Sequence, residues 1–495
     1  MLCAGYVAVR LWRLTDPCLW FDEIFGVHAA EHSWSGMWWF AAQDLIHPPM
    51  FYALLKMWIG LGGDGLPWLR LFPVFFATLA LIPFLYLCRE LKLKTSATLL
   101  ALALFAVNGS LIKYAQEVRM YSLFLCLSLF SLWLFARFFY RGKNIWILTA
   151  VNILLVYTHY FGWLVVLSEV LIILIMQRIK VRHVLVMAGI AAVSFVPWLV
   201  AVWRAASGGS DIGQNIGWIG RPGFREVFDL FFDLVEPFYF QISSVDPRTL
   251  LWVSLPMIVV FIVAKAAYLA EKNSEGRERM VILSIFIGVP ITAAFLMSWL
   301  SPYSVWGSRH LIVIFAPVTI LFAIYLSEIR SAFLRNGLLA VVTLVIIAAF
   351  VRTTANPPRE QIWCEWERSV EAAVLDQKDA TIYAFEDLAA YHLWFAARRS
   401  NLSVMKVNGV DGIVEDKAYF LPRGMQDALK VADAGDVPSA ADLPGGKVYF
   451  AFRDTAWNEH HQPIEFFKTK GYRVREVYAS DAVQGMRVFL GEASK

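Results

Sequence analysis

Apolar residues run in stretches of bilayer length through the first 350 positions of this chain. A helix needs about 20 mainly apolar residues to cross the hydrocarbon core of a membrane, so the sequence predicts a polytopic α-helical membrane protein. Together with a short apolar stub at 1–14, we expect about 11 transmembrane helices. The other expected spans lie near 67–88, 96–113, 118–137, 144–158, 160–177, 183–203, 249–270, 280–299, 309–327 and 333–351.

The composition agrees with a membrane protein and argues against nucleic-acid binding. Hydrophobic residues make up 58% of the chain and charged residues 17%, against roughly 25% charged in an average soluble domain. Lys and Arg number 44 and Asp and Glu 40, for a net charge of +4, and the basic residues form no block or tail. We therefore expect no nucleic-acid partner.

Lys and Arg collect in alternate loops, and basic loops stay on the cytoplasmic side of a membrane. These loops lie near 89–94, 137–143, 178–182, 265–279 and 330–335. The opposite face receives the segments 15–66 and 204–248, tight turns near 114–117 and 159, the loop 300–308 and everything after about residue 352. We expect a cytoplasmic N-terminus. The stub at 1–14 is short for a span, so either its helix is tilted or the chain begins upstream.

The tail 352–495 changes character and predicts a small α/β domain outside the cytoplasm. Strand composition occurs at 381–385, 447–452, 473–478 and 486–490, and helical composition at 386–398 and 463–470. Glu459, His460 and His461 suggest solvated side chains more than a metal site. We expect this domain to have a supporting role or to recognise another molecule rather than to perform chemistry. Cys18 and Cys364 lie on the same expected side, so a disulfide between them is possible, but we expect them to be unpaired.

Polar residues in the first external segment are the first candidates for chemistry. Asp22 and Glu23 follow an aromatic pair, and Asp44 and His47 precede the sequence Pro48-Pro49. Carboxylates favour the first turn of a helix, so a solvated helix cap is the alternative for Asp22 and Glu23. A turn before a helix is the alternative for His47, because proline is common at helix starts.

Three other polar groups interrupt the apolar pattern, and ionisable groups at membrane depth are usually functional. The groups are Glu117, Arg119 and Tyr121; His159 and Tyr160; and Arg309 and His310. Each has an alternative to a functional role: the Arg119 side chain could snorkel to the lipid headgroups, His159 could be a loop histidine with its hydrogen bonds satisfied, and Arg309 could anchor the chain to lipid headgroups.

The external loop 204–248 contains a flexible tract at 207–210 and an amphipathic helical pattern. Apolar residues from Phe224 to Val235 recur at helical spacing, opposite an acidic face. We expect this helix to lie along the outer membrane interface, either as a lid that orders when a ligand enters or as a static packing helix. The acidic face consists of Glu226, Asp229, Asp233 and Glu236.

Read in order, these motifs resemble bacterial glycosyltransferase family 39, a group of GT-C fold enzymes similar to protein O-mannosyltransferases and to lipid A aminoarabinose transferase. The resemblance covers roughly residues 5–330. It rests on the order, spacing and common side of the motifs. They are WFDE at 20–23, HPPMFY at 47–52, RLFP at 70–73, YAQEVRMY at 114–121, YTHY at 157–160 and SRH at 308–310, followed by an apolar span.

The resemblance implies a GT-C-like catalytic domain at 1–351, with a catalytic loop at 15–66, and a periplasmic domain at 352–495. Such a protein lies in the bacterial inner membrane. It moves a sugar from a polyprenyl-phosphate donor to a hydroxyl of a lipid, glycan or protein, with inversion at the sugar. Membrane lipids surround it.

The resemblance also implies roles for residues. Asp22 is the general base, and Glu23 orients it or the acceptor. Arg119 and Arg309 stabilise the leaving phosphate. The remaining substrate-binding residues are Asp44, His47, Glu117, Tyr121, His159, Tyr160 and His310. Some GT-C members hold a divalent metal, for which Asp22, Asp44, His47 and His159 are the ligands this chain offers; the metal stays unassigned.

Two other functions fit many apolar spans. A transporter or flippase of lipid-linked sugars would usually show internal repeats and interrupted helices near the middle of the bilayer, and the sequence shows neither. A non-catalytic scaffold would leave Asp22, Arg119, His159 and Arg309 without a role.

Overall fold

The computed structural model describes residues 1–210, 212–239, 247–271, 276–355, 361–413, 429–442, 446–483 and 485–495. Their contacts divide the chain into two compact units. The first consists of Met1–Thr15, Ala29–Gly208 and Ile219–Pro358, and the second of Asp16–His28, Gly209–Trp218 and Arg359–Lys495. Two segments that precede the tail by more than a hundred residues therefore belong to the same unit as the tail.

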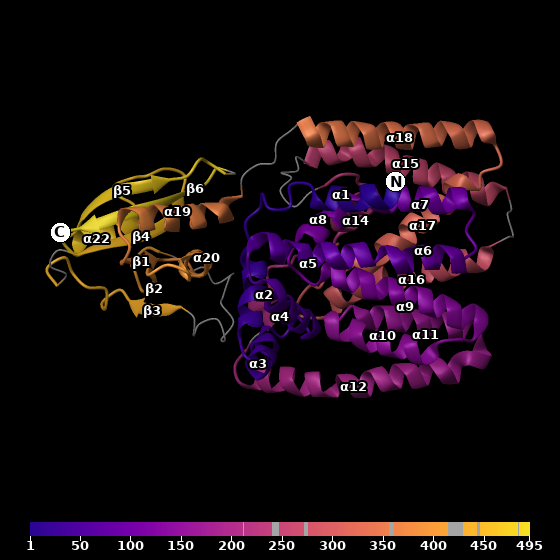
Figure 1. Cartoon of the computed structure of the whole chain (residues 1–495), viewed down its shortest axis with the longest axis horizontal. Helices are drawn as coiled ribbons and strands as arrows, with labels where there is room; N and C mark the ends of the chain where they lie inside the picture. Colours follow the sequence, from indigo (N-terminus) through magenta and orange to yellow (C-terminus); the bar gives the residue numbers. More distant parts are fainter. Residues whose placement is uncertain are drawn as a thin grey trace. The chain divides into compact units, whose positions relative to one another are not determined.

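The first unit is helical, and its helices lie side by side (Figure 1). Within the described residues, 6 helices are long and apolar enough to cross a membrane: Leu66–Glu90, Tyr121–Arg141, Arg178–Ser207, Trp252–Ala270, Arg277–Leu300 and Ala332–Ala355. Shorter apolar helices accompany them. The expected polytopic helical architecture is confirmed, whereas the number of about 11 spans is not.

The helices of this unit carry the labels of Figure 1. They are α1 (Leu2–Leu11), α3 (Trp34–Asp44), α4 (Met50–Gly62), α5 (Leu66–Leu79), α6 (Leu81–Glu90), α7 (Thr95–Val107), α8 (Gly109–Gln116), α9 (Tyr121–Arg141), α10 (Ile145–Thr158), α11 (Gly162–Met176), η1 (Arg178–Lys180), α12 (Val181–Ser207), α14 (Phe224–Val235), α15 (Pro247–Ala270), α16 (Arg277–Leu300), η2 (Ile312–Ile314), α17 (Phe315–Ser327) and α18 (Ala332–Ala355). Helix α2 (Phe21–Glu31) begins in the second unit and ends in the first.

Helix α9 lies inside the bundle and α18 at its edge (Figure 1). The most apolar stretch of α9 is 78% buried, against 11% for that of α18. A bilayer is as apolar as a protein core, so α18 loses nothing by facing lipid. The buried helices instead carry polar side chains that pair: Ser131 of α9 and Asn152 of α10 both hydrogen-bond to Glu169 of α11, at 2.6 and 2.7 Å.

Helix α14 occupies the place of the expected external amphipathic helix, but its faces are turned. Phe224, Phe228 and Phe231 are exposed, whereas Glu236 is buried at its end. Asn108, at the start of α8, donates to the carbonyl oxygens of Asp233 and Leu234 and so fixes the end of α14 to the bundle. The phenylalanines can therefore face lipid, and Asp233 and Glu236 turn inward, whereas Asp229 of the same acidic face stays exposed.

The second unit contains the expected α/β domain, built on one sheet with the strand order β3-β2-β1-β4-β6-β5. The first four strands in this order are parallel neighbours, and β4, β6 and β5 pair antiparallel. All expected strands and helices are present, and α19, β2 and β3 are additional. The elements are α19 (Ile362–Asp376), β1 (Thr381–Ala384), α20 (Asp387–Ala397), β2 (Ser403–Asn408), β3 (Lys430–Asp433), β4 (Lys447–Asp454), α22 (Gln462–Thr469), β5 (Arg473–Ala479) and β6 (Arg487–Ser494), with the short α13 (Ile212–Ile216).

Successive residues of a strand point to opposite faces of the sheet, which fixes where the helices pack. Tyr383 of β1 and Phe450 of β4 share a core with Ile464 and Phe467 of α22. Helices α19 and α20 pack on each other and on β6, β1 and β2. We infer that α22 covers one face of the sheet and that α19 and α20 cover the other.

The segment 16–28 is fixed to the rest of the second unit by a disulfide and by aromatic contacts. Cys18 bonds to Cys364, 346 residues away, so the expectation of unpaired cysteines is wrong. The ring of Phe21 contacts that of Tyr391, with centroids 5.5 Å apart, and His28 Nδ1 hydrogen-bonds to the Tyr391 hydroxyl at 2.9 Å. The segment that carries Asp22 is thus held by α19 and α20.

Replacement of this disulfide should destabilise the protein. We expect Cys18→Ser to lower the free energy of unfolding by roughly 2–4 kcal/mol, because the bond restricts the unfolded chain. Thermal unfolding in nanodiscs measures the change. Cys3→Ser, which alters an exposed free cysteine, is the matched control and should leave the melting temperature unchanged. Equal melting temperatures for both variants would contradict a structural role for the bond.

Candidate functional site

Five polar side chains that the sequence singles out converge at helix ends in the first unit. We call Asp44, His47, Arg119, His159 and His310 the helix-end cluster. Asp44 is the last residue of α3, and His47 lies in the turn before α4. Arg119 precedes α9, His159 separates α10 from α11, and His310 precedes η2. Polar residues at these ends avoid the cost of burial within the apolar spans.

The turn between α3 and α4 brings Asp44 and His47 together. Leu45 caps the end of helix α3 with a φ of 62°, which reverses the chain, and Pro49 caps the start of α4. Asp44 Oδ2 accepts a hydrogen bond from His47 Nδ1 at 2.5 Å. Arg119 Nη2 lies 3.2 Å from His47 Nε2, and since a guanidinium can only donate, His47 Nε2 accepts. The three side chains form a buried chain from carboxylate to guanidinium.

His159 and His310 complete the cluster. Their ring centroids are 5.6 Å apart, and the ring of His47 lies 6.3 Å from that of His159. His159 Nδ1 accepts from the backbone N–H of Phe161, which leaves the proton of the neutral ring on Nε2. His310 Nδ1 donates to the carbonyl oxygen of Val305, which leaves a lone pair on its Nε2. The two rings therefore offer one donor and one acceptor.

Burial and the arginines set the protonation of these groups. Burial lowers the pKa of His159 well below its usual 6.5, and the neighbouring His310, His47, Arg119 and Arg309 lower it further. Burial and Arg309 lower the pKa of His310 to about 3. Burial raises the pKa of Asp44 to about 7, against a lowering by Arg119. Both histidines are neutral near pH 7, and the net local charge favours an anion.

Tyr160 lies next to the cluster and fixes the turn that follows Asp44. Its hydroxyl donates to the carbonyl oxygen of Leu45 at 3.1 Å and accepts from Trp198 Nε1 at 3.1 Å. It therefore fastens the residue after Asp44 to α11 and α12. Trp198 is a contributor that the sequence analysis missed, because it lies in an ordinary apolar run.

Glu117 and Tyr121 belong to a second polar group next to the cluster. Glu117 lies 3.9 Å from Lys113, and Tyr121 packs on Tyr114, with ring centroids 5.1 Å apart. The Tyr114 hydroxyl lies 3.3 Å from Ser308 Oγ, beside Arg309 in the chain.

Two acids of the α14 region also act on Lys113 of this group. Burial raises the pKa of Asp233 to about 6 and that of Glu236 to about 8, and Lys113 lowers both. The amphipathic pattern of α14 revealed these acids, but not that they turn inward.

Asp22 and Glu23 lie in the second unit, in the first turn of α2. Glu23 is fully buried, and its Oε2 accepts from the backbone N–H of Trp20 at 3.1 Å. The helix-cap interpretation therefore holds for Glu23, although the cap is buried rather than solvated. Asp22 is partly exposed and one residue away from this fixed cap.

The described residues do not make a metal site of the kind the resemblance left open. Among them, no group of three or more His, Cys, Asp or Glu side chains has the geometry to hold an ion. Both nitrogens of His47 are engaged, by Asp44 and by Arg119, so this ring has no lone pair to give a metal.

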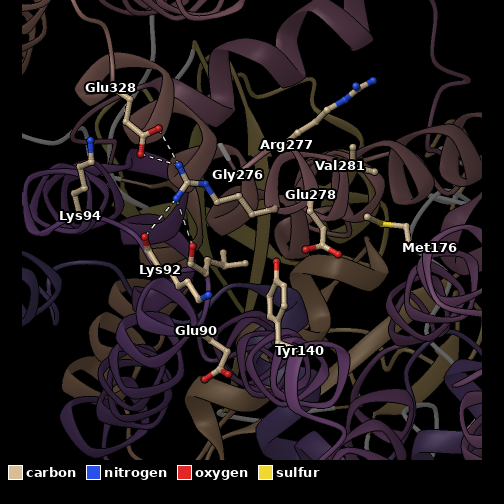
Figure 2. A pocket seen from close by; sticks show the side chains of 12 residues that line it. Glu90, Lys92, Lys94, Tyr140, Met176, Gly276, Arg277, Glu278, Val281 and Glu328 are labelled. Atoms are coloured by element: carbon tan, nitrogen blue, oxygen red, sulfur yellow. Dashed lines mark hydrogen bonds and ion pairs between the residues drawn. The ribbon is translucent and has the colours of Figure 1, made fainter. Parts of the chain in front are cut away.

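A second polar region lies at the opposite end of α9, about 30 Å away along its 21 residues. A cavity of about 870 Å³ is lined there by Glu90, Lys92, Tyr140, Glu278 and Glu328 among others (Figure 2). The guanidinium of Arg279 donates to Glu328 at 2.7 and 2.8 Å, and to the carbonyl oxygens of Leu91 and Lys92. These charges tie helix ends together, and the site residues that the sequence singled out lie elsewhere.

The neutral histidines should make the protein less stable in acid. The unfolded chain takes up protons on His159 and His310 below about pH 6.5, while the folded protein resists them, so each costs up to about 1.4 kcal/mol per pH unit. We expect the melting temperature in nanodiscs to fall between pH 7.5 and 4.5, and to fall less in a His159→Asn/His310→Asn variant. His460→Asn, at an exposed histidine, should behave as wild type. An unchanged fall in the double variant would refute the assignment.

Comparison with known proteins bears on the fold. No family model matches the sequence, and no curated protein matches it significantly. Among solved structures, ArnT from Cupriavidus metallidurans in the apo state matches with a TM-score of 0.63 and 13% identity over 99% of this chain and 97% of that chain.

The same enzyme bound to undecaprenyl phosphate gives a TM-score of 0.58 and 12% identity, over the same shares of both chains. An oligosaccharyltransferase from Archaeoglobus fulgidus, solved with zinc and sulfate, is less similar, with a TM-score of 0.47 and 13% identity over 81% of this chain and 62% of that chain. The chain thus shares the fold of ArnT along its whole length, and the GT-C fold expected from the sequence motifs is confirmed.

Proposed function

We propose that this chain is a membrane glycosyltransferase that moves a sugar from a polyprenyl-phosphate donor to an acceptor hydroxyl of a glycan, lipid or protein. The observation that carries the proposal is the helix-end cluster. A guanidinium and two neutral imidazoles meet there at the ends of apolar helices, within the influence of Arg309. The fold shared with ArnT, one structure of which holds undecaprenyl phosphate, supports this donor class.

A lipid-linked phosphate has chemistry that matches the cluster. Its polyprenyl chain is apolar and its phosphate is an anion, so it needs a cationic site at the edge of the hydrocarbon. Arg119 and Arg309 would stabilise the charge that develops on the leaving phosphate, more strongly in a buried site than in water. The Nε2–H of His159 is a further donor, and Asp44 with His47 positions Arg119.

The transfer is proposed as a single displacement. The acceptor hydroxyl gives its proton to the Asp22 carboxylate while its oxygen bonds to the anomeric carbon of the sugar. The bond from that carbon to the phosphate oxygen breaks, and polyprenyl phosphate leaves. Attack opposite the leaving group inverts the anomeric configuration. Glu23 already caps the start of α2, so it suits an orienting role, and Asp22 suits the role of base.

The proposed location is the bacterial inner membrane, with the reaction at the periplasmic face. The loops rich in Lys and Arg support this orientation, because such loops stay cytoplasmic. Of these basic residues, Lys92, Lys94, Arg277 and Arg279 line the cavity at the opposite end of α9 from the helix-end cluster. The disulfide between Cys18 and Cys364 also suits an oxidising compartment.

Removal of the Asp22 carboxylate should slow turnover strongly. We expect Asp22→Asn to lower the rate by about 10²–10⁴, the usual contribution of a general base. The assay follows release of polyprenyl phosphate from a panel of polyprenyl-phosphate sugars, with periplasmic extract as the acceptor source and the protein in nanodiscs. Asp16→Asn, on the same segment, is the matched control and should retain activity.

The other outcomes are informative. If Asp22→Asn and wild type consume a donor equally, Asp22 is not the base and Glu23 or Asp44 becomes the next residue to test. If wild type consumes no donor, the glycosyltransferase proposal fails, and the transporter alternative is tested by a flipping assay.

Under this proposal, Arg119 stabilises the charge that develops on the leaving phosphate. We expect Arg119→Gln to lower kcat by roughly 10²–10³, the loss typical for one stabilising donor. Arg141→Gln is the matched control, because Arg141 pairs with Glu90 at the other end of α9, and it should retain the wild-type rate. A wild-type rate in Arg119→Gln would exclude this side chain from the reaction.

A further inference from the structure

The second unit contains a crevice whose position in the sheet is characteristic of ligand sites. From β1 the chain passes through α20 to β2 and then to β3, all on one side of β1, whereas β4 lies on its other side. Helix α20 follows β1 onto one face of the sheet, and α22 follows β4 onto the opposite face. In open sheets with parallel strands, ligands bind at the carboxyl ends of the strands where the strand order reverses in this way.

A cavity of about 370 Å³ lies at this point, within the roughly 300–1,000 Å³ typical of small-molecule sites. Its lining comes from the carboxyl ends of neighbouring strands: Glu386 follows β1, Arg453 and Asp454 end β4, and Gly412 follows β2. The residues before and at the start of α22, including Gln462, complete it.

The charges of the lining disfavour an anion. Arg453 Nε donates to Glu386 Oε2 at 2.8 Å, so the cation of the crevice is already neutralised. Asp454 adds a second carboxylate, 3.2 Å from His461 Nδ1. The chain after β1 reads Phe385-Glu386-Asp387, with acids where a phosphate-binding turn would have glycines. A nucleotide or phosphate therefore does not suit the site.

The same lining suits a neutral ligand with many hydroxyl groups. The paired carboxylate and guanidinium and the Gln462 amide offer donors and acceptors at the rim, while Phe452 and Pro463 offer apolar surface. A pyranose ring presents this combination, hydroxyls at its edge and C–H groups on its faces. Gly412 has a φ of 80°, and a Cβ there would collide with the Gln462 side chain, so glycine keeps this amide in place.

We propose that this crevice binds a neutral saccharide. Under the proposed transfer reaction, on which this extension rests, the saccharide belongs to the acceptor, so the second unit selects a glycan or a glycosylated molecule. The binding itself does not depend on the reaction.

The test is saccharide binding by the full chain in nanodiscs, and saturation-transfer NMR measures the binding. The probes are glucose, galactose, N-acetylglucosamine and their β-1,4-linked disaccharides, with AMP and inorganic phosphate as anionic probes. We expect at least one saccharide to bind, and Arg453→Gln and Gln462→Ala each to weaken it at least fivefold. Arg475→Gln, which alters an Arg–carboxylate pair on β5 and β6, is the matched control and should bind as wild type.

The proposal is overturned if none of these saccharides binds, if both crevice variants bind as wild type, or if an anionic probe binds and is lost in the variants. Donor consumption is measured separately on the same proteins. Binding without any donor consumption by wild type would leave the saccharide site standing and refute the transferase, whereas consumption without binding would refute only the saccharide site.

Discussion

The absence of water inside a bilayer is the constraint on which the first unit depends. Every polar group at that depth must find a partner within the protein, so spans are apolar and polar side chains gather at helix ends or pair across helices. Glu169 shows the second solution, bonded to both Ser131 and Asn152. The helix-end cluster shows the first, and it gathers there the groups that we propose bind the donor phosphate.

Partners also fix the chemical state of the cluster. The position of each proton follows from the group that faces each nitrogen. His47 Nδ1 donates a hydrogen bond to Asp44, His47 Nε2 accepts one from Arg119, and His310 Nδ1 donates one to the carbonyl oxygen of Val305. Burial and the neighbouring arginines, by contrast, keep His159 and His310 neutral. The Arg119 guanidinium and the His159 Nε2–H are preformed donors, which can stabilise charge without rearrangement during a reaction.

The second unit includes part of the first external segment as well as the C-terminal tail. The Cys18–Cys364 bond and the contacts of Phe21 and His28 with Tyr391 make the first external segment part of its structure. If Asp22 is the base, the C-terminal domain positions it. The same domain carries the crevice at its strand ends. The residue proposed to deprotonate the acceptor and the crevice proposed to bind it therefore belong to one unit.

The sequence by itself determined the apolar helices, the α/β tail and the polar positions at helix ends, because these follow from local periodicity and composition. It missed helix α19 and the strands β2 and β3, whose short runs form strands only by pairing, β2 with β1 and β3 with β2. Tertiary structure alone decided that His47 meets Arg119, 72 residues away, that Asp233 and Glu236 turn inward at the end of α14, and that Cys18 reaches Cys364. Such pairings depend on how helices and strands pack in space, and no local pattern records which distant residue will be adjacent.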